Sequence, residues 1–224
     1  MATIFKPGIK YYDLSNPISG NMPFYPASFP VQVTQVSSSD AGKANVHKIT
    51  MASHHGTHVD APWHAIPSGM RLDEMDLNKF MGEGIVLDLS FKEVGSGIAA
   101  GDLEKFSNLV RLGDIAILYT GCSSHLSEPW INSSYTYLDL SGAEWLVRKQ
   151  VKAVGIDVFS VDQYGDGSHP AHHALLGNDI PLIEEISSAA KHLLGKRIYL
   201  ICLPIRMMMG DGAPARAIAY ELES

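Results

Sequence analysis

The 224-residue sequence is poor in cysteine, and this limits the kinds of site that it can build. Its two cysteines, Cys122 and Cys202, lie 80 positions apart and form no CxxC pair. A disulfide framework and a cysteine-based zinc site are therefore not expected. Because free cysteine is among the residues most often buried, we predict two buried thiols at strand ends.

Long apolar runs and clusters of basic residues are missing as well. The formal net charge is -7 and no lysine- or arginine-rich run occurs, so nucleic acid and anionic lipid are not expected partners. The first residues, MATIFKPGIKYYDL, lack the apolar core of a secretory signal, and no stretch of about 18 apolar residues could span a bilayer. The sequence predicts a cytoplasmic enzyme without membrane association.

Several motifs of common enzymes are also absent. The chain contains no GxSxG, GxxxxGK[ST] or GxGxxG, so a serine-hydrolase elbow, a phosphate loop and a dinucleotide fold lose their main support. Ser123 and Ser124 adjoin His125. Residues adjacent in sequence seldom reach triad geometry, so we interpret these three as a polar loop after a strand.

What is present indicates one globular domain over residues 1–224, since 46% of residues are apolar and 18% are charged. Apolar runs rich in β-branched residues predict strands, and apolar residues spaced by three and four predict amphipathic helices. The strands are Val46–Met51, Gly84–Leu89, Asp114–Thr120, Ala153–Phe159, Arg197–Leu203 and Arg216–Leu222, and the helices are Gly101–Val110, Ser141–Val151 and Ile183–Leu194. This mixture without a strict βαβ rhythm predicts an α/β fold with a mixed sheet.

A Pro-rich stretch near the N-terminus, Met22–Pro30, cannot form a regular helix and predicts a loop. Its aromatic residues Phe24, Tyr25 and Phe29 are costly to leave in water. They therefore pack either on the body of the protein or over a ligand.

Four of the ten histidines lie in the segment from Ser53 to His64, together with Asp60. Imidazole and carboxylate are ligands that Zn²⁺, Mn²⁺ and Fe²⁺ accept. In a straight strand His54 and His58 would stand about 13 Å apart, at about 3.3 Å per residue, which is too far for one ion. Gly56 can supply a bend through a positive φ, so we expect His54, His58 and Asp60 to converge on a cation.

Pro62 breaks the segment before His64, which we place just outside the ligands as a proton-transfer residue, because its ordinary pKa is near neutrality. We interpret His47 and His55 as surface or structural residues. Three ligands leave room for others, and the segments His169–Leu176 and Leu182–Ile186 offer candidates. Glu184 and Glu185 fall at the predicted helix start, where carboxylates are favoured in any case.

The stretch HHGTHVDAPWH, residues 54–64, resembles the HxGTHxDxPxH signature of the cyclase family, which contains kynurenine formamidases and isatin hydrolases. Further segments that are similar to the family are Asp13–Ile18, Gly113–Gly121, Val154–Asp162 and Asp211–Arg216. The resemblance implies a swivelling β/β/α type of α/β fold with a mixed sheet and flanking helices. It also implies a homo-oligomer, either a dimer or a tetramer.

The resemblance further implies that His54, His58 and Asp60 bind a first ion and that Asp60 bridges to a second. A histidine followed twelve residues later by a glutamate completes the second site in the family. His172 with Glu184 and His173 with Glu185 both fit that spacing, and the alignment of Ile180–Glu184 favours the first pair. The implied cofactor is one or two Zn²⁺ ions, with Mn²⁺ as the alternative.

The implied reaction is hydrolysis of a small amide or formamide, for which we expect an aromatic substrate. Metal-activated water attacks the carbonyl, and His64 is the general acid and base. Tyr25 stands where the formamidases place a substrate-binding tryptophan, and we expect it to line the substrate. Open alternatives are an isatin hydrolase-like lactam hydrolase that uses Mn²⁺, a metal-dependent lyase or cyclase, and a non-catalytic metal-binding protein.

Overall fold

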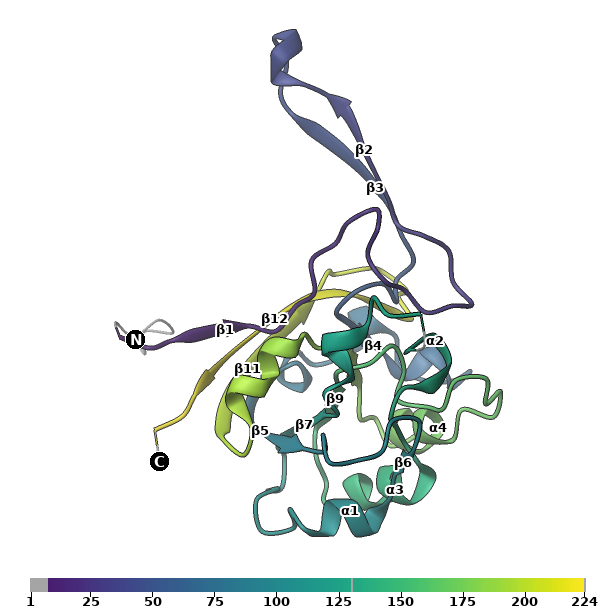
Figure 1. Ribbon diagram of the computed structural model, residues 1–224, viewed down its shortest axis with the longest axis vertical. Helices are drawn as coiled ribbons and strands as arrows, with labels where there is room; N and C mark the ends of the chain where they lie inside the picture. Colours follow the sequence, from purple (N-terminus) through teal and green to yellow (C-terminus); the bar gives the residue numbers. More distant parts are fainter. Residues whose placement is uncertain (1–7, 130, 224) are drawn as a thin grey trace.

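The computed structural model describes residues 8–129 and 131–223, and its centre is one eight-stranded sheet (Figure 1). The strand order is β1-β12-β11-β5-β7-β9-β10-β4, and β12 also pairs with β4, so that seven of the strands close into a ring. The strands are β1 Tyr11–Asp13, β4 His58–Asp60, β5 Met81–Asp88, β7 Ile115–Tyr119, β9 Ala153–Ile156, β10 Leu182–Glu184, β11 Arg197–Pro204 and β12 Gly212–Glu221.

The sheet is mixed, as the sequence predicts. Strands β5, β7, β9 and β10 run parallel to their neighbours in this group, whereas β4, β11, β12 and β1 add antiparallel pairs. Successive side chains of a strand point to opposite faces, and β7 shows the consequence. Ile115 and Ile117 pack into one apolar core, and Ala116 and Leu118 pack into the other.

Helices cover the face of the sheet that carries the second of these cores. They are α1 Ala100–Glu104, α2 Ile131–Ser134, α3 Leu140–Arg148 and α4 Pro170–Leu176. The side chain of Asp139 caps α3 by accepting a hydrogen bond from the Gly142 amide at 3.0 Å. Trp145 and Leu146 of α3 and Leu175 of α4 are buried in the core beneath them.

Two smaller pairings complete the fold. Strands β2 Gln32–Ser37 and β3 Val46–Thr50 form an antiparallel hairpin that projects well beyond the body of the protein (Figure 1). Strands β6 Gly97–Ile98 and β8 Tyr137–Leu138 pair in parallel. Short 3-10 turns lie at 39–41, 62–64, 72–74, 77–79, 122–125 and 188–193.

The predicted strands are confirmed, with bounds that shift by a few residues, and the predicted mixed α/β class is confirmed with them. The Pro-rich stretch is a loop, as expected, and both cysteines are buried and free. Cys202, however, lies within β11 rather than at its end. Within the described ranges, no helix is both long and apolar enough to cross a membrane.

Two helix predictions need correction. Of the segment Gly101–Val110, only the first four residues, Gly101 to Glu104, are α-helical; with Ala100 they form α1, and the residues that follow are in turns. The predicted helix Ile183–Leu194 is wrong, because its start belongs to β10 and residues 188–193 form a 3-10 turn. Residues Leu182–Glu184 find hydrogen-bonding partners on both sides, in β9 and β4, and this sheet pairing overrides the local helical pattern. Glu184 is thus a strand residue.

Candidate metal centre

The turn between His54 and His58 is built as the sequence predicts. Gly56 has φ of +65°, a conformation that residues with a Cβ seldom adopt. The bend brings the ring centres of His54 and His58 to 5.0 Å. Strand β4 then carries His58 and Asp60 to the same side, because residues two apart in a strand share a face.

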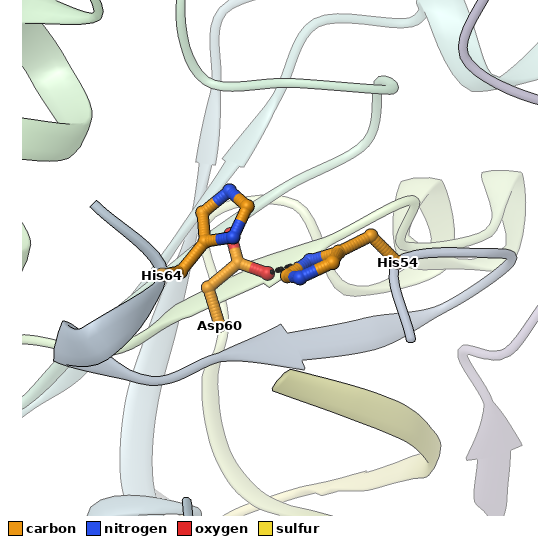
Figure 2. Close-up of side chains that lie close together, drawn as sticks. All are labelled: His54, Asp60 and His64. Atoms are coloured by element: carbon orange, nitrogen blue, oxygen red, sulfur yellow. Dashed lines mark hydrogen bonds and ion pairs between the residues drawn. The ribbon is translucent and has the colours of Figure 1, made fainter. Parts of the chain in front are cut away.

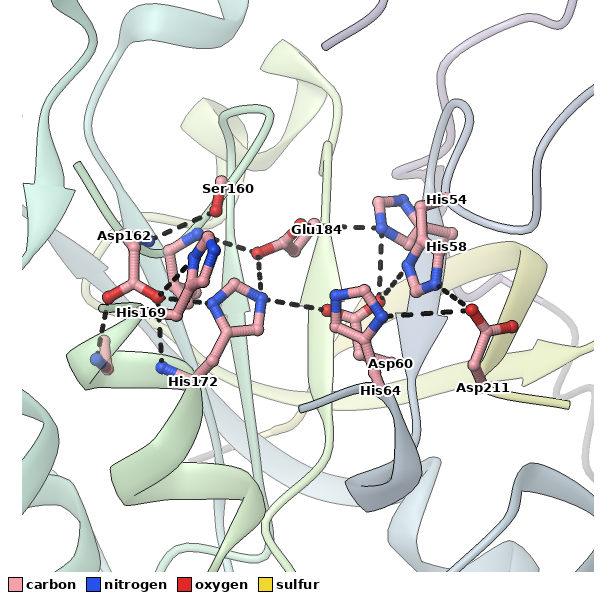
Figure 3. Close-up of polar contacts among 12 residues, drawn as sticks. His54, His58, Asp60, His64, Ser160, Asp162, His169, His172, Glu184 and Asp211 are labelled. Atoms are coloured by element: carbon pink, nitrogen blue, oxygen red, sulfur yellow. Dashed lines mark hydrogen bonds and ion pairs between the residues drawn. The ribbon is translucent and has the colours of Figure 1, made fainter. Parts of the chain in front are cut away.

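Antiparallel pairing of β4 with β10 places Glu184 directly opposite His58. Helix α4 adds His172 from a third element (Figure 3). His58 Nε2 lies 3.3 Å from Asp60 Oδ1 and 3.5 Å from Glu184 Oε2, while His172 Nε2 lies 3.5 Å from Asp60 Oδ2 and 3.6 Å from Glu184 Oε1. Two imidazoles and two carboxylates therefore face one another in a buried cluster, which we call the four-residue cluster.

Both imidazoles of the four-residue cluster are oriented through their other nitrogen. His58 Nδ1 lies 2.7 Å from the Gly56 carbonyl, to which it can only donate, and His172 Nδ1 lies 2.5 Å from Asp162 Oδ2. These contacts leave the Nε2 atoms directed at the carboxylates, the arrangement by which proteins orient metal-binding histidines. Sequence reasoning did not single out Asp162, although a polar residue shortly after a buried strand was a usable signal.

In the four-residue cluster, burial and neighbouring charges shift pKa values in opposite directions. Burial opposes the charged form of His172, yet Asp162 and Asp60 raise its pKa to about 10. Burial also opposes the charge on His58, and Asp60 and Glu184 raise its pKa well above the ordinary value. Conversely, burial disfavours the Asp60 carboxylate, but His54 and His58 hold its pKa well below its usual range. The Asp60 carboxylate thus stays ionised and attracts positive charge.

His54 and His64 lie close to Asp60 of this cluster (Figure 2). Both side chains are more exposed than those of His58 and His172. His54 Nδ1 is 2.6 Å from Asp60 Oδ1, and its Nε2 is 3.0 Å from Asp211 Oδ2. Burial opposes the charge on His54, but Asp60 and Asp211 raise its pKa to about 9. The hydrogen bond from His54 lowers the pKa of Asp211 to about 2. Sequence reasoning placed Asp211 only within a family-like segment and missed it as a neighbour of the site.

His64 differs from the other histidines of the site in its environment. Its ring centre lies 4.0 Å from that of His54 and 5.5 Å from that of His172. Burial lowers its pKa, and the neighbouring His54 and His172 add to this against the pull of Asp60. The side chain keeps 34% of its surface exposed. His64 is therefore a neutral base at neutral pH that solvent can reach.

The structure separates the alternatives that spacing left open. It brings His172 and Glu184 into the cluster, whereas His173 is exposed on the outer side of α4. Glu185 is buried and lines a different cavity, and among the described residues it belongs to none of the groups of close ligand atoms.

The Pro-rich loop contributes Tyr25 to the surroundings of the site. Its ring lies 5.7 Å from that of Tyr164, and burial, Tyr164 and Glu184 raise the pKa of its hydroxyl. Phe24 and Phe29 instead pack edge-on against His55. The Nδ1 atom of His55 accepts from the Ala52 amide at 2.8 Å and its Nε2 donates to Ser28 Oγ at 3.0 Å, so His55 anchors the loop.

The chemistry of this site fits a divalent cation. Among the described residues, His58 Nε2 and Asp60 Oδ2 are buried without a hydrogen-bond partner, a costly state that a cation would relieve. Ligand atoms of His58, Asp60 and Glu184 lie within 4.8 Å of one another, and so do those of His54, Asp60 and His64. Nitrogen and carboxylate donors are the set that zinc and manganese accept.

Comparison with known proteins agrees with this geometry. The kynurenine formamidase of Bacillus anthracis is 30% identical over 210 residues, which cover 93% of this chain and 96% of that protein. A structure described as a predicted metal-dependent hydrolase from Bacillus stearothermophilus matches with a TM-score of 0.81 and 25% identity, over 96% of this chain and 100% of the other. An isatin hydrolase bound to the product analogue thioisatinate has a TM-score of 0.88 at 18% identity, covering 96% and 93%, which shows a shared fold.

The family model described as "Putative cyclase" matches residues 12–163, more than half of the chain and including the whole segment from His54 to His64. The relative and the structural neighbours named above are hydrolases. The chain therefore belongs to this cyclase family.

Proposed function

We propose that this protein is a metal-dependent hydrolase of a small aromatic amide or formamide, similar to kynurenine formamidase. The observation that carries the proposal is the four-residue cluster with its unpaired His58 Nε2 and Asp60 Oδ2. The ligands we propose are His54, His58 and Asp60 for one ion, and Asp60, His172 and Glu184 for a second. We propose zinc, with manganese as the alternative.

A divalent cation held there supplies Lewis-acid polarisation of a carbonyl and lowers the pKa of water. The residues of the chain provide orientation and proton transfer. Gly56 and Asp162 fix the two imidazoles of the cluster through their Nδ1 atoms. His64 is neutral and reachable, so it accepts a proton at the site and returns it to the leaving nitrogen.

Tyr25 and Tyr164 form the proposed wall for the substrate. Their rings are 5.7 Å apart, and the influence of Glu184 and Asp162 on the pKa of Tyr25 indicates that its hydroxyl lies near the cluster. Flat apolar surface next to a polar reaction centre suits an aromatic substrate.

We also propose that the protein is a homo-oligomer and that residues 1–224 form one domain. The β2–β3 hairpin supports the first point. Val33 and Ile49 are directly opposite one another on it and remain 40% and 53% exposed. A two-stranded hairpin with exposed apolar pairs is marginally stable by itself, so a second copy of the chain is the expected cover. Light scattering after size-exclusion chromatography tests this, with monomer as the contrary result. The cytoplasmic location stays a prediction from the sequence.

The decisive experiment combines elemental analysis of the purified protein with a hydrolysis screen. The substrates are N-formylkynurenine, isatin and simple formamides, each with and without a chelator. We expect bound zinc or manganese and chelator-sensitive hydrolysis of a formamide. Turnover of isatin alone would assign a lactam hydrolase, dehydrated or ring-closed products would assign a lyase or cyclase, and a metal-free protein would contradict the proposal.

A further inference from the structure

Strand β11 buries only one of its two sides. Ile198, Leu200 and Cys202 lie in an apolar core and have no exposed surface. Successive side chains of a strand point to opposite faces, so the residues that alternate with these face the other way. They are Tyr199, Ile201 and Leu203, and all three remain partly exposed. One side of β11 therefore presents large apolar and aromatic side chains to solvent.

The partly exposed side of β11 continues onto β12. Ile218 lies opposite Ile201, and Tyr220 lies opposite Tyr199 with the two rings stacked at 5.6 Å between centres. The core beneath α1, α3 and α4 includes residues of β5, β7 and β9 and, within the described chain, none of β11 or β12. The helices thus leave this part of the sheet uncovered. We call it the bare sheet face, and its residues are Tyr199, Ile201, Leu203, Ile218 and Tyr220.

A groove of about 640 Å³ adjoins the bare sheet face, and Leu203 belongs to both. Most of the residues that line the groove are apolar, and two of them, Ile18 and Ile205, are 43% and 66% exposed. Contiguous apolar surface on a soluble protein marks an interaction site, because leaving such surface in water is unfavourable. The groove and the bare sheet face together form one such surface.

The β2–β3 hairpin carries a second apolar surface without cover. Besides the opposed pair Val33 and Ile49, Val36 and Val46 of this hairpin are 59% and 47% exposed. All strand residues of the hairpin except Ser37 are exposed, so it has no core of its own. Figure 1 shows the hairpin projecting away from the body, including β11 and β12. It therefore leaves the bare sheet face of its own chain free.

The hairpin also differs from the rest of the chain in charge. The charged residues within positions 32–50 are Asp40, Lys43 and Lys48, which give a formal net charge of +1, whereas the whole chain carries -7. A basic hairpin is attracted to the acidic body of another copy. One chain thus holds two unpartnered apolar surfaces of opposite net charge, and two copies related by a two-fold axis can cover both.

We propose that the β2–β3 hairpin of a second copy packs with Val33 and Ile49 on the bare sheet face and its groove, and that the exchange is reciprocal. This inference rests on the homo-oligomer proposed above and names the surfaces that hold it together. It predicts a closed dimer, since both hairpins and both faces are used. None of the proposed metal ligands belongs to either surface, so the hydrolase proposal is independent of it.

Cross-linking of the full-length, metal-loaded protein tests this contact. The variant Ile49→Cys/Leu203→Cys is treated with a short bismaleimide; both native cysteines are buried, so the parent gives the background. We expect a covalent dimer as the main product, with a cross-link between positions 49 and 203 in its peptide mass spectrum. The matched control is Ile49→Cys/Leu140→Cys, because Leu140 of α3 is 46% exposed and Leu203 is 40% exposed. This control should give background levels only.

A charge placed on either side of the hairpin gives a second readout. Ile49→Asp should raise the dissociation constant of the dimer by at least about 100-fold, as measured by light scattering over a range of concentrations. Thr34→Asp lies on the same hairpin but points to its other face, so its dissociation constant should stay near that of the parent. Metal content and circular dichroism should match the parent in both variants, because these positions are exposed.

The outcomes separate this inference from the proposed homo-oligomer. A parent that is monomeric in light scattering would overturn both. An oligomeric parent would leave the homo-oligomer standing but overturn the hairpin contact if the Leu140 control cross-links equally well, or if the 49–203 product is intramolecular. Cross-linked chains longer than dimers would overturn the reciprocal exchange, and equal dissociation of the Thr34→Asp and Ile49→Asp variants would overturn the role of the Val33–Ile49 side.

Discussion

Two buried carboxylates, Asp60 and Asp157, show how differently this protein treats the same chemical group. Asp157 follows β9 and accepts five hydrogen bonds, from the amides of Thr120, Gly121 and Ser123 and from the hydroxyls of Thr120 and Ser123, at 2.6 to 3.3 Å. Asp60 lies on β4, faces three histidines and leaves its Oδ2 without a hydrogen bond.

The electrostatic consequences are opposite. Burial raises the pKa of Asp157 above its ordinary value, against its neutral donors. Burial acts on Asp60 too, but His54 and His58 hold its pKa well below the usual range. Asp157 has its hydrogen bonds satisfied by the turn after β7, which it fixes, and we call it the closed side of the comparison. Asp60 keeps an oxygen without a hydrogen bond and faces imidazoles, and we call it the open side. Burial of a carboxylate alone therefore does not mark a metal ligand, and it is the incomplete pairing of Asp60 beside imidazoles that supports its proposed role as one.

The largest expected effect tests the open side of this comparison. Asp60→Asn keeps the shape but removes the charge shared by both proposed ions. We expect loss of bound metal and a fall in turnover of at least about 10³-fold. Substitution of residues that only hydrogen-bond to metal ligands already lowers metal affinity or activity by about 10–100-fold. Elemental analysis and initial rates measure this, with circular dichroism as the check on folding. A variant that retains its full metal complement would remove Asp60 from the site.

His64→Ala separates proton transfer from metal binding at the same open site. We expect turnover to fall by about 10²–10⁴-fold, the usual contribution of general acid–base catalysis, while the metal content is unchanged. Exogenous imidazole should restore part of the rate. His47→Ala, exposed on the hairpin, is the control. Loss of metal in His64→Ala would instead make His64 a ligand.

Asp162→Asn asks whether orientation of an imidazole matters as much as its presence. Asp162 contacts His172 Nδ1 at 2.5 Å and also accepts from the Ala171 amide at 2.7 Å. We expect metal affinity to weaken by about 10–100-fold in the folded protein, as titration with a competing chelator would show. Asp166→Asn, in the nearby exposed turn, should have no such effect. Equal affinities in the two variants would contradict a positioning role.

Asp157→Asn tests the closed side and should have the smallest effect on function. The amide group cannot accept all of the five hydrogen bonds, so we expect the free energy of unfolding to fall by about 1.5–3 kcal/mol. Metal content and affinity should remain as in the parent. Urea denaturation measures the stability, and a loss of metal in this variant would break the distinction drawn between the two carboxylates.

The parts of the fold that the sequence predicted best are those that depend on short-range patterns. The strands of the sheet carry continuous β-branched runs, and α3 carries a clear amphipathic pattern with a capping aspartate. The segment Ile183–Leu194 misled prediction because its spacing is helical, while its first residues lie between β9 and β4 and pair with both. A pattern within one segment holds no information about which strands stand beside it.

The sequence by itself determined the local half of the site. Eleven residues hold four of the proposed site residues, namely His54, His58, Asp60 and His64. The bend that brings them together has a φ of +65° at Gly56, which glycine adopts without strain because it has no Cβ. The tertiary structure decided the rest. Glu184 meets His58 through antiparallel register, and His172 lies on α4. Asp162 lies in the loop between β9 and α4, and Asp211 directly precedes β12. Contacts between residues more than 100 positions apart depend on how the whole sheet closes, which no local spacing specifies.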